Sequence, residues 1–360
     1  MRIAFITRST LYKIYGGSGV QITETAKQLE QLGLTVRIFL THEKIPYQEF
    51  DLLHFFDITR PANILYHIKK TKKPFVVSTI LVDYSEYDKK YRKGLGGFIF
   101  RLLPGNTNEY LKTVGRWLTG KDSLRSLSYL WKGQTGSIKK ILRKAVLLLP
   151  NSHVEYESLE KKYAIDKPHF VIPNGIDTKL FCPGKNDIKE DDLVICAARV
   201  EGIKNQLNLI KAMNNTRFRL VMIGDATPGQ RNYFEACKKI AANNISFVGN
   251  LRQEELVNYY RKAKVHVLPS WFETCGLSSL EAAAMGCNIV VSNKGFVKDY
   301  FGHDGFYCEP GDPASIYNAV EKAADGSSQK KLQEKVLTEF TWEQAALQTL
   351  SAYKTILPNR

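Results

Sequence analysis

Short apolar runs alternate along the chain with segments whose apolar residues recur at helical spacing, and this alternation predicts a parallel α/β fold. An apolar run at 2–6 is followed by a glycine-rich loop at 16–19, a helical pattern at 20–32 and a second apolar run at 35–40. A strand, a tight turn, a helix and a strand within about 40 residues are typical of the βαβ unit of a parallel sheet. Further apolar runs predict strands at 51–56, 74–80 and 145–149.

A second series of the same kind begins near Phe170, and a polar, proline-containing stretch at 166–168 marks the expected linker. Helical patterns separate its apolar runs at 193–198, 218–223, 245–248, 265–268 and 288–291. The sequence therefore predicts two doubly wound Rossmann-like domains facing across a cleft, with ligands at the carboxyl ends of the strands. The expected domains are 1–166 and 167–340, followed by a closing helix in 341–360 that returns toward the first.

The segment from Lys89 to Lys144 interrupts the first series and carries most of the net charge. It holds 14 lysine and arginine residues against two acidic ones, so it contributes +12 to a net charge of +15. Its leucines recur at helical spacing with cations between them, which predicts two or three short basic amphipathic helices. We interpret this insert as a docking surface for an anionic membrane. A solvated basic face, or a soluble anionic acceptor, is the alternative.

Aromatic residues lie among these cations, as they do in proteins that bind single-stranded nucleic acid. Trp117, Tyr129 and Trp131, however, fall at helical spacing among leucines. That spacing favours packing in a core or in a membrane, so we expect no nucleic-acid partner.

The remaining composition indicates the compartment. Six scattered cysteines without a C-x-x-C pair are typical of a reducing environment. The apolar start at 1–6 is too short for a signal peptide, and no apolar run reaches the roughly 18 residues that span a bilayer. We therefore expect a cytoplasmic protein, peripheral on the inner face of the plasma membrane.

An apolar run that ends at Pro269 precedes the strongest chemical signal in the chain. A helix is predicted to begin near Gly276, and the start of a helix offers free N–H groups and partial positive charge to a phosphate. Glycine lets a ligand approach that backbone closely. Glu273 at the rim and Glu281 one turn inside can accept hydrogen bonds from sugar hydroxyls. A nucleotide sugar suits this arrangement.

The same residues resemble the E-x7-E motif of retaining glycosyltransferase family 4, whose members have two Rossmann-like domains in the GT-B fold. Pro-Ser before Glu273 and Glu-Ala-x-Ala-x-Gly from Glu281 strengthen the likeness. The resemblance implies that Glu273 positions the transferred sugar and that Glu281 holds the ribose. It also implies that the backbone after Glu273 contacts the donor, at Cys275, Gly276, Leu277 and Ser278.

Other segments of the second domain resemble the same family. The segments at 174–178 and 340–343 are similar to its N-G-[IV]-D and terminal F-[ST]-W patterns. Arg199 and Lys204 match its R-x4-K loop, which implies that the two cations clamp the diphosphate and stabilise the leaving group. Surface charges are the alternative for these two residues. Leu251 lies in a stretch that is similar to the loop that meets the base.

The first domain matches the family less closely. Gly17 lies in the glycine-rich loop, which is similar to a loop near the phosphates and the acceptor; a plain tight turn is the alternative. After the strand at 75–79 the family commonly has a histidine, which this chain lacks, and Asp83 is our candidate for the acceptor side. His54 resembles a family position, and a structural histidine is an equally open interpretation.

The resemblance implies a retaining hexosyltransferase that uses a UDP- or GDP-linked sugar and needs neither a metal nor another cofactor. It implies front-face attack by the acceptor hydroxyl, with the leaving phosphate assisting proton removal. The expected acceptor is a glycan or a saccharide carried on polyprenyl diphosphate, in bacterial surface polysaccharide or glycolipid synthesis. Two alternatives stay open: a basic membrane- or nucleic-acid-binding protein on an inactive transferase fold, and a same-fold nucleotide-sugar epimerase.

Overall fold

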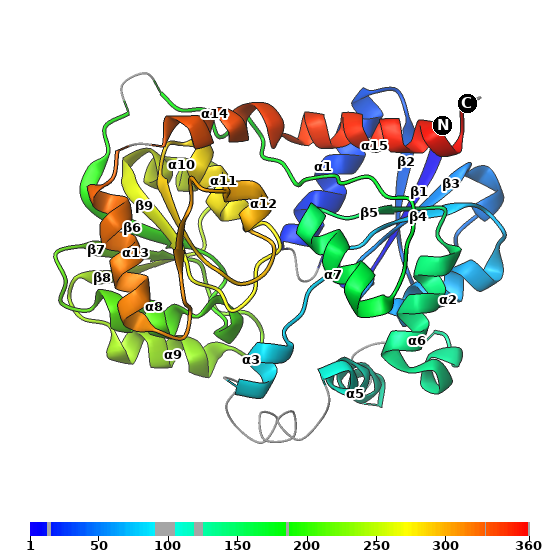
Figure 1. Cartoon of the computed structure of the whole chain (residues 1–360), viewed down its shortest axis with the longest axis horizontal. Helices are drawn as coiled ribbons and strands as arrows, with labels where there is room; N and C mark the ends of the chain where they lie inside the picture. The colour runs from blue at the N-terminus through cyan, green and yellow to red at the C-terminus, as the bar shows by residue number, and fades with distance from the viewer. Residues whose placement is uncertain (13–15, 91–104, 119–124, 185–186, 328, 359–360) are drawn as a thin grey trace. The chain divides into compact units, whose positions relative to one another are not determined.

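The chain forms two compact units, and each contains one parallel sheet. A computed structural model describes residues 1–12, 16–90, 105–118, 125–184, 187–327 and 329–358. The first unit consists of Met1–Asn174 together with Trp342–Arg360, and the second of Gly175–Thr341 (Figure 1).

The first unit is built on five parallel strands in the order β2-β1-β3-β4-β5. Nearly every residue of the three central strands is buried, as expected for a sheet that is covered on both faces. The strands are β1 (Arg2–Thr7), β2 (Thr35–Leu40), β3 (Leu52–Phe56), β4 (Phe75–Ser78) and β5 (Leu147–Leu149).

Helices cover both faces of this sheet. On one face α1 (Gly17–Gln31) packs against α15 (Trp342–Ile356), and on the other α6 (Ser128–Lys144) packs against α2 (Pro61–Lys70) and α7 (His153–Tyr163). The smaller elements are η1 (Tyr47–Glu49), α3 (Ser85–Lys90) and α5 (Gly105–Leu118).

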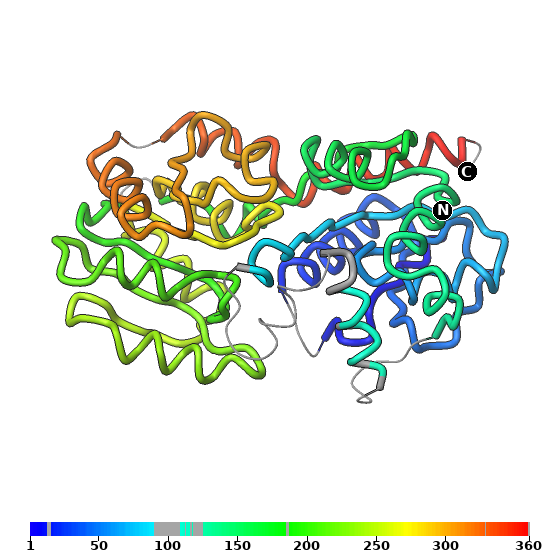
Figure 2. Tube along the Cα trace, turned by 60° about the horizontal axis from the view of Figure 1, so that its bottom comes forward, coloured from blue at the N-terminus to red at the C-terminus, as the bar shows by residue number. Residues whose placement is uncertain are grey.

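A buried histidine fastens the C-terminal helix to this sheet. In β3, His54 shares hydrogen bonds with the Tyr353 hydroxyl through Nδ1 at 2.6 Å and with Ser78 Oγ through Nε2 at 2.8 Å. Burial lowers the pKa of His54 to about 3, so the ring is neutral at physiological pH. Of the two interpretations of this residue, the geometry supports the structural one. Both views show α15, in red, in the unit that holds the N-terminus (Figures 1 and 2).

The second unit is built on six parallel strands in the order β11-β10-β9-β6-β7-β8. A single apolar core runs through it and includes most of β6, β9 and β10. The strands are β6 (Glu190–Ala197), β7 (Arg219–Ile223), β8 (Ile245–Gly249), β9 (Ala263–Leu268), β10 (Asn288–Ser292) and β11 (Phe306–Cys308).

The helices of the second unit also lie on both faces of its sheet. One face carries α8 (Gln206–Met213), α9 (Arg231–Ile240) and α13 (Pro313–Asp325); the other carries α10 (Gln253–Lys262), α11 (Leu277–Ala284) and α14 (Lys330–Glu339). The short elements are η2 (Gly202–Lys204) and α12 (Lys298–Phe301).

The predicted fold class, two Rossmann-like α/β domains, is confirmed by the two parallel sheets. The first unit ends at Asn174, after the linker expected at 166–168, because the chain there continues as extended backbone beside β5. Leu148 N donates to Pro168 O at 3.1 Å, and Phe170 N donates to Leu148 O at 3.0 Å.

The basic insert predicted at 89–144 is described only in part. Its residues 91–104 and 119–124 lie outside the described residues, while α5 and α6 occupy the stretches around them. Non-helical backbone at Gly133 divides α6. The predicted amphipathic helices therefore coincide with α5 and α6. None of the described helices is long and apolar enough to cross a membrane.

Candidate functional site

The candidate site lies where the strand order of the second sheet reverses direction. The chain runs from β6 outward to β7 and β8, then returns to place β9 on the other side of β6. The loops after β6 and β9 therefore leave neighbouring strand ends, which is where open α/β sheets bind ligands. These loops carry Arg199 and Lys204 after β6, and Glu273 after β9.

Glu273 is the centre of this cluster. Its side chain is only 9% exposed, and it forms an ion pair with Lys204, whose side chain is 19% exposed. Ser270 Oγ donates a hydrogen bond to Oε1 of the same carboxylate at 2.8 Å. Both contacts go to Oε1, and no described residue is seen to donate to Oε2. The second oxygen is thus the one that can accept from a ligand hydroxyl.

Backbone hydrogen bonds tie the two loops together. Trp271 N donates to Ile203 O at 2.9 Å, which joins the loop after β9 to η2. The buried amide of Asn205 donates to Pro269 O at 3.0 Å and to Pro310 O at 2.7 Å. Lys204 and Glu273 are therefore positioned by a rigid backbone as well as by their own attraction.

A glycine after the next strand supports Glu273 from behind. Phe296 N donates to Glu273 O at 2.8 Å, and the chain at Gly295 pairs with Glu273 as a parallel bridge. Gly295 has φ +88°, and a Cβ on it would lie 2.0 Å from Glu273 O. Only glycine allows the two backbones to approach this closely.

Helix α11 begins at Leu277, shortly after Glu273 in the sequence. Gly276 adopts a left-handed conformation at φ +69° as its N-cap, and no described side chain caps this end of the helix. Leu277 and Ser278 begin the helix and are partly exposed, whereas Cys275 is buried. Uncapped N–H groups at a helix start can bind a phosphate.

Glu281 lies in the second turn of α11 and is partly buried. The Tyr260 hydroxyl donates to Glu281 Oε2 at 3.2 Å. Burial raises the pKa of Glu281 to about 8, although the Tyr260 hydrogen bond lowers it. The carboxyl is therefore largely protonated at neutral pH in the absence of a ligand.

Arg199 and Lys204 differ in their surroundings. Arg199 is 42% exposed, and its guanidinium contacts Glu201 Oε1 at 2.8 Å. Lys204 is mostly buried and paired with Glu273, so the surface-charge alternative does not describe it. An ammonium group carries three donors, so Lys204 can hold Glu273 and a phosphate oxygen together.

Two other predicted donor residues lie elsewhere. Leu251 follows β8, where it packs partly buried against the core of the second unit. Gly17 begins α1 in the first unit and is exposed.

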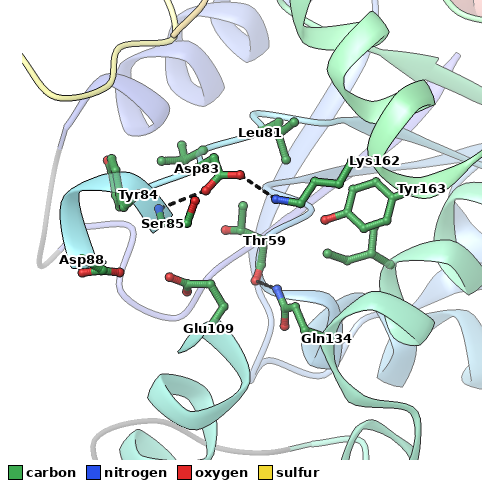
Figure 3. Close-up of a pocket in the computed structure, with 12 residues that line it drawn as sticks. Thr59, Leu81, Asp83, Tyr84, Ser85, Asp88, Glu109, Gln134, Lys162 and Tyr163 are labelled. Carbon is green, nitrogen blue, oxygen red and sulfur yellow. Dashed lines mark hydrogen bonds and ion pairs between the residues drawn. The ribbon is translucent and has the colours of Figure 1, made fainter. Parts of the chain in front are cut away.

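Asp83 lines a small recess of about 30 Å³ in the first unit, whose lining is both polar and apolar, and Figure 3 shows its carboxylate between Lys162 and Ser85. Lys162 Nζ donates to Asp83 Oδ2 at 2.6 Å, and Ser85 N donates to Oδ1 at 3.0 Å. Although burial raises it, these contacts hold the pKa of Asp83 below its usual value. Glu109 and Gln134 line the same recess, which is large enough for water or for a protruding polar group of a ligand.

Sequence reasoning missed several residues that shape these sites. Asn205, Gly295, Tyr260 and Lys162 act through long-range contacts. Ser270 acts through a local hydrogen bond to Glu273, three residues later. A glycine soon after a buried strand was an available signal for Gly295, since a close backbone approach needs that residue type.

Comparisons with known proteins bear on the family and the fold of this chain. A family model described as glycosyl transferases group 1 matches residues 181–336, which include all of β6 to β11 and the candidate site. Residues 181–336 of the chain thus belong to this family. A group 1 relative, the MMP α-(1→4)-mannosyltransferase of Mycolicibacterium hassiacum, is 25% identical over 240 residues. That match covers 62% of this chain and 57% of the relative, so the chain spans little more than half of the relative's length.

Solved structures share the whole fold of this group 1 protein. The sucrose-phosphate synthase of Thermosynechococcus elongatus has a TM-score of 0.77 at 18% identity, with 100% of both chains covered. The HepE protein of Anabaena, in complex with UDP-glucose, has a TM-score of 0.71 at 16% identity, with 99% of this chain and 100% of that chain covered. The predicted GT-B fold is thereby confirmed; the predicted family is confirmed by the family model over residues 181–336.

Proposed function

We propose that this chain is a retaining hexosyltransferase that moves a sugar from a nucleotide-sugar donor to a saccharide acceptor. The observation that carries the proposal is the contact of Lys204 and Ser270 with one oxygen of Glu273, beside the uncapped start of α11. Membership of the glycosyl transferases group 1 family supports it.

The donor's diphosphate is proposed to bind at the start of α11 and beside the two cations. Backbone N–H groups from Gly276 to Ser278, Lys204 and Arg199 offer positive charge in one region of the second unit, where charge develops on a departing nucleotide. Glu201 holds Arg199 in the free protein, and a phosphate could replace that partner.

Glu273 is proposed to position the transferred sugar through Oε2. A charge-assisted hydrogen bond to one hydroxyl fixes the ring relative to its leaving group. Glu281 is proposed to accept from the ribose, and Leu251 and Gly17 to contact other parts of the donor. Departure of the phosphate and front-face attack by the acceptor hydroxyl, with retention, complete the proposed reaction without a cofactor.

A UDP- or GDP-linked hexose is the proposed donor class. The HepE protein of Anabaena was solved in complex with UDP-glucose, which makes UDP-glucose the first compound to test here.

The acceptor is proposed to reach the first unit, where Asp83 lines a small recess. A saccharide linked to a polyprenyl diphosphate would place the protein in the cytoplasm, on the inner face of the plasma membrane. Exposed apolar side chains on α6 beside basic ones support that placement: Trp131 is 77% exposed and Leu127, at the N-cap, is 63% exposed.

The test is a screen of UDP-, GDP- and ADP-glucose by thermal shift, followed by an assay of nucleotide release. The matching nucleotide sugar should raise the melting temperature and release its nucleotide slowly in water. Glu273→Gln should abolish release, whereas Glu254→Gln, an exposed change on α10, should leave it intact. Binding without nucleotide release would favour an epimerase, which returns an intact nucleotide sugar; no binding of any of the three would contradict the proposal.

A further inference from the structure

A buried carboxylate in the first unit lies outside the proposed chemistry. Glu155, near the start of α7, is fully buried and accepts three hydrogen bonds. The donors are the Thr79 hydroxyl and Leu81 N (2.7 Å), both to Oε1, and Asn151 N (2.9 Å) to Oε2. Thr79 and Leu81 follow β4, and Asn151 follows β5, so one side chain joins two neighbouring loops at the carboxyl edge of the sheet.

Helix capping does not account for this arrangement. Ser152 is the N-cap of α7, and its Oγ accepts from Glu155 N at 3.1 Å, which is half of a capping box. In a full capping box the glutamate would return to the N-cap N–H. Here its carboxylate extends to another loop, 74 and 76 residues earlier in the sequence.

The loop that Glu155 contacts contains a residue in an unfavourable backbone conformation. Ile80 has φ +42°, in a region that β-branched residues rarely adopt. Its neighbours on both sides donate to the same oxygen of Glu155. Strain of this kind persists only where the surrounding structure enforces it, and it is common at functional sites.

A residue near the C-terminal end of α7 also contacts the loop that follows β4. Lys162 is one residue from the end of the helix and donates to Asp83 at 2.6 Å, as Figure 3 shows. The segment from Thr79 to Asp83 is therefore fixed by Glu155 where it leaves β4 and by Lys162 where it enters the recess.

Asn151 extends the network to the helix that follows the glycine-rich loop. Gln21 Nε2 in α1 donates to Asn151 Oδ1 at 2.8 Å, and Asn151 Nδ2 donates back to Gln21 Oε1 at 3.3 Å. Both residues are buried. The loops after β4 and β5 and the first turns of α1 thus share one continuous set of hydrogen bonds.

Burial and hydrogen bonding act in opposite directions on the Glu155 carboxyl. Burial raises the pKa of Glu155, although the hydrogen bonds from Thr79, Leu81 and Asn151 lower it. A carboxyl whose folded pKa exceeds its unfolded value loses stability as the pH rises between those two values. Burial thus opposes ionisation of Glu155, and the three hydrogen bonds that it accepts offset part of this effect.

We propose that Glu155 is a positioning residue, which acts with Lys162 through α7 to hold the segment 79–83 in the shape that presents Asp83 to the acceptor. This inference rests on the proposed transferase function, because it concerns how an acceptor is oriented. Glu155 itself touches neither substrate.

Hydrogen–deuterium exchange of the intact chain tests the geometry without any ligand. In the wild-type protein the amides of Leu81 and Asn151 should exchange as slowly as strand amides. In Glu155→Gln a single acceptor oxygen remains and cannot serve both loops, because the amide NH2 accepts from neither. Peptides covering 79–84 or those covering Asn151 should therefore exchange at least about tenfold faster. Glu157→Gln, an exposed change on the same helix, should match the wild type. Should Glu155→Gln not fold, Glu155→Asp, whose carboxylate is too short to reach the loop, takes its place.

Steady-state kinetics distinguish a positioning role of Glu155 from a general loss of structure. With UDP-glucose as donor and octyl glucoside as a lipid-like sugar acceptor, Glu155→Gln should raise the KM for octyl glucoside about tenfold. The affinity for UDP-glucose, most of whose proposed contacts lie in the second unit, should stay the same.

Unprotected Leu81 and Asn151 amides in the wild type, or an unchanged exchange rate and KM in Glu155→Gln, would overturn the inference. A wild-type protein that releases no UDP from UDP-glucose and transfers nothing to octyl glucoside would instead count against the donor or acceptor assignment. The exchange measurement alone then decides whether Glu155 holds the loop.

Discussion

Lys204 and Glu273 form an ion pair between the loops that follow β6 and β9, two neighbouring strands of the second sheet. The pair joins a cation expected to contact the donor's phosphates to a carboxylate expected to contact its sugar. Each side chain is mostly buried, so the contact has a defined geometry rather than that of a loose surface pair. Donor binding at this site would add a phosphate and a sugar hydroxyl to a cluster that already exists.

Removing Lys204 should therefore affect both turnover and stability. In Lys204→Ala, kcat for UDP release from UDP-glucose should fall about 100- to 1000-fold, the usual effect of losing one electrostatic donor to the transition state. The free energy of unfolding should fall by about 1–3 kcal/mol, because Glu273 keeps a buried charge without its cation. Lys211→Ala, an exposed change on α8, is the matched control for both measurements. A Lys204→Ala protein with wild-type kcat would remove this cation from the mechanism.

The raised pKa of Glu281 predicts that donor affinity depends on pH. The carboxyl titrates at about 8 in the free protein, and a ribose hydroxyl binds best to the ionised form. Affinity for UDP-glucose should therefore rise with pH, by up to about tenfold per unit below pH 8, and level off above it. Isothermal titration between pH 6 and 8.5 measures this slope.

Glu281→Gln supplies the control for that profile. A glutamine cannot ionise, so its affinity for UDP-glucose should be flat over the same range and about 1–3 kcal/mol weaker than the wild type at pH 8.5. Because the folded pKa of Glu281 lies above its unfolded value of about 4.5, wild-type stability should also fall relative to the variant as the pH rises from 4.5 to 8. Parallel profiles for the two proteins would exclude Glu281 as the titrating group.

Local sequence signals predicted much of this site. A buried strand, Pro269, and a glycine before a helical pattern were enough to predict the start of α11 and the place of Glu273, since those features depend on neighbours in the chain. Three-residue β11 was missed because so short an edge strand shows no periodicity. Glu155 carried a visible Ser-x-x-Glu pattern, yet that pattern predicts a local cap and says nothing of a loop 74 residues away.

Gly295 should be needed for the backbone that supports Glu273. Gly295→Ala places a Cβ 2.0 Å from Glu273 O, so the two strands of chain must separate. The affinity for UDP-glucose should fall at least about tenfold, and the melting temperature should drop by several degrees, as for a change worth a few kcal/mol.

Gly229→Ala isolates the clash from the cost of the backbone conformation. Gly229 has φ +83°, close to that of Gly295, but nothing lies within 4 Å of its Cβ position. Its substitution should cost only the roughly 1–2 kcal/mol of a left-handed conformation. Equal effects of the two substitutions on UDP-glucose affinity would mean that the close approach to Glu273 is unimportant.

The exposed face of α6 leads to the last prediction, binding to anionic membranes. Trp131 and Leu127 expose apolar surface to water next to Lys132 in the sequence, and Arg143 and Lys144 are exposed at the other end of α6. Apolar side chains that enter the headgroup region, together with cations worth about 1 kcal/mol each near an anionic leaflet, are typical of interfacial helices. Vesicles of phosphatidylglycerol and phosphatidylcholine should therefore carry the protein upward in a flotation gradient, whereas pure phosphatidylcholine vesicles should not.

Two sets of variants divide this binding into its causes. Changing Lys139, Lys140, Arg143 and Lys144 to Gln should weaken it by at most about 1000-fold at low salt, and rising salt should weaken the wild type in the same way, because surface charges are screened within about 8–10 Å. Trp131→Ala should weaken it at every salt concentration, since apolar burial is not screened.

The matched control removes four exposed cations of the second unit, Lys238, Lys239, Lys330 and Lys331, and should float like the wild type. If it loses binding to the same extent as the α6 variant, net charge rather than this face explains the attraction; if the wild type floats with neither kind of vesicle, the basic insert serves a soluble anionic acceptor instead.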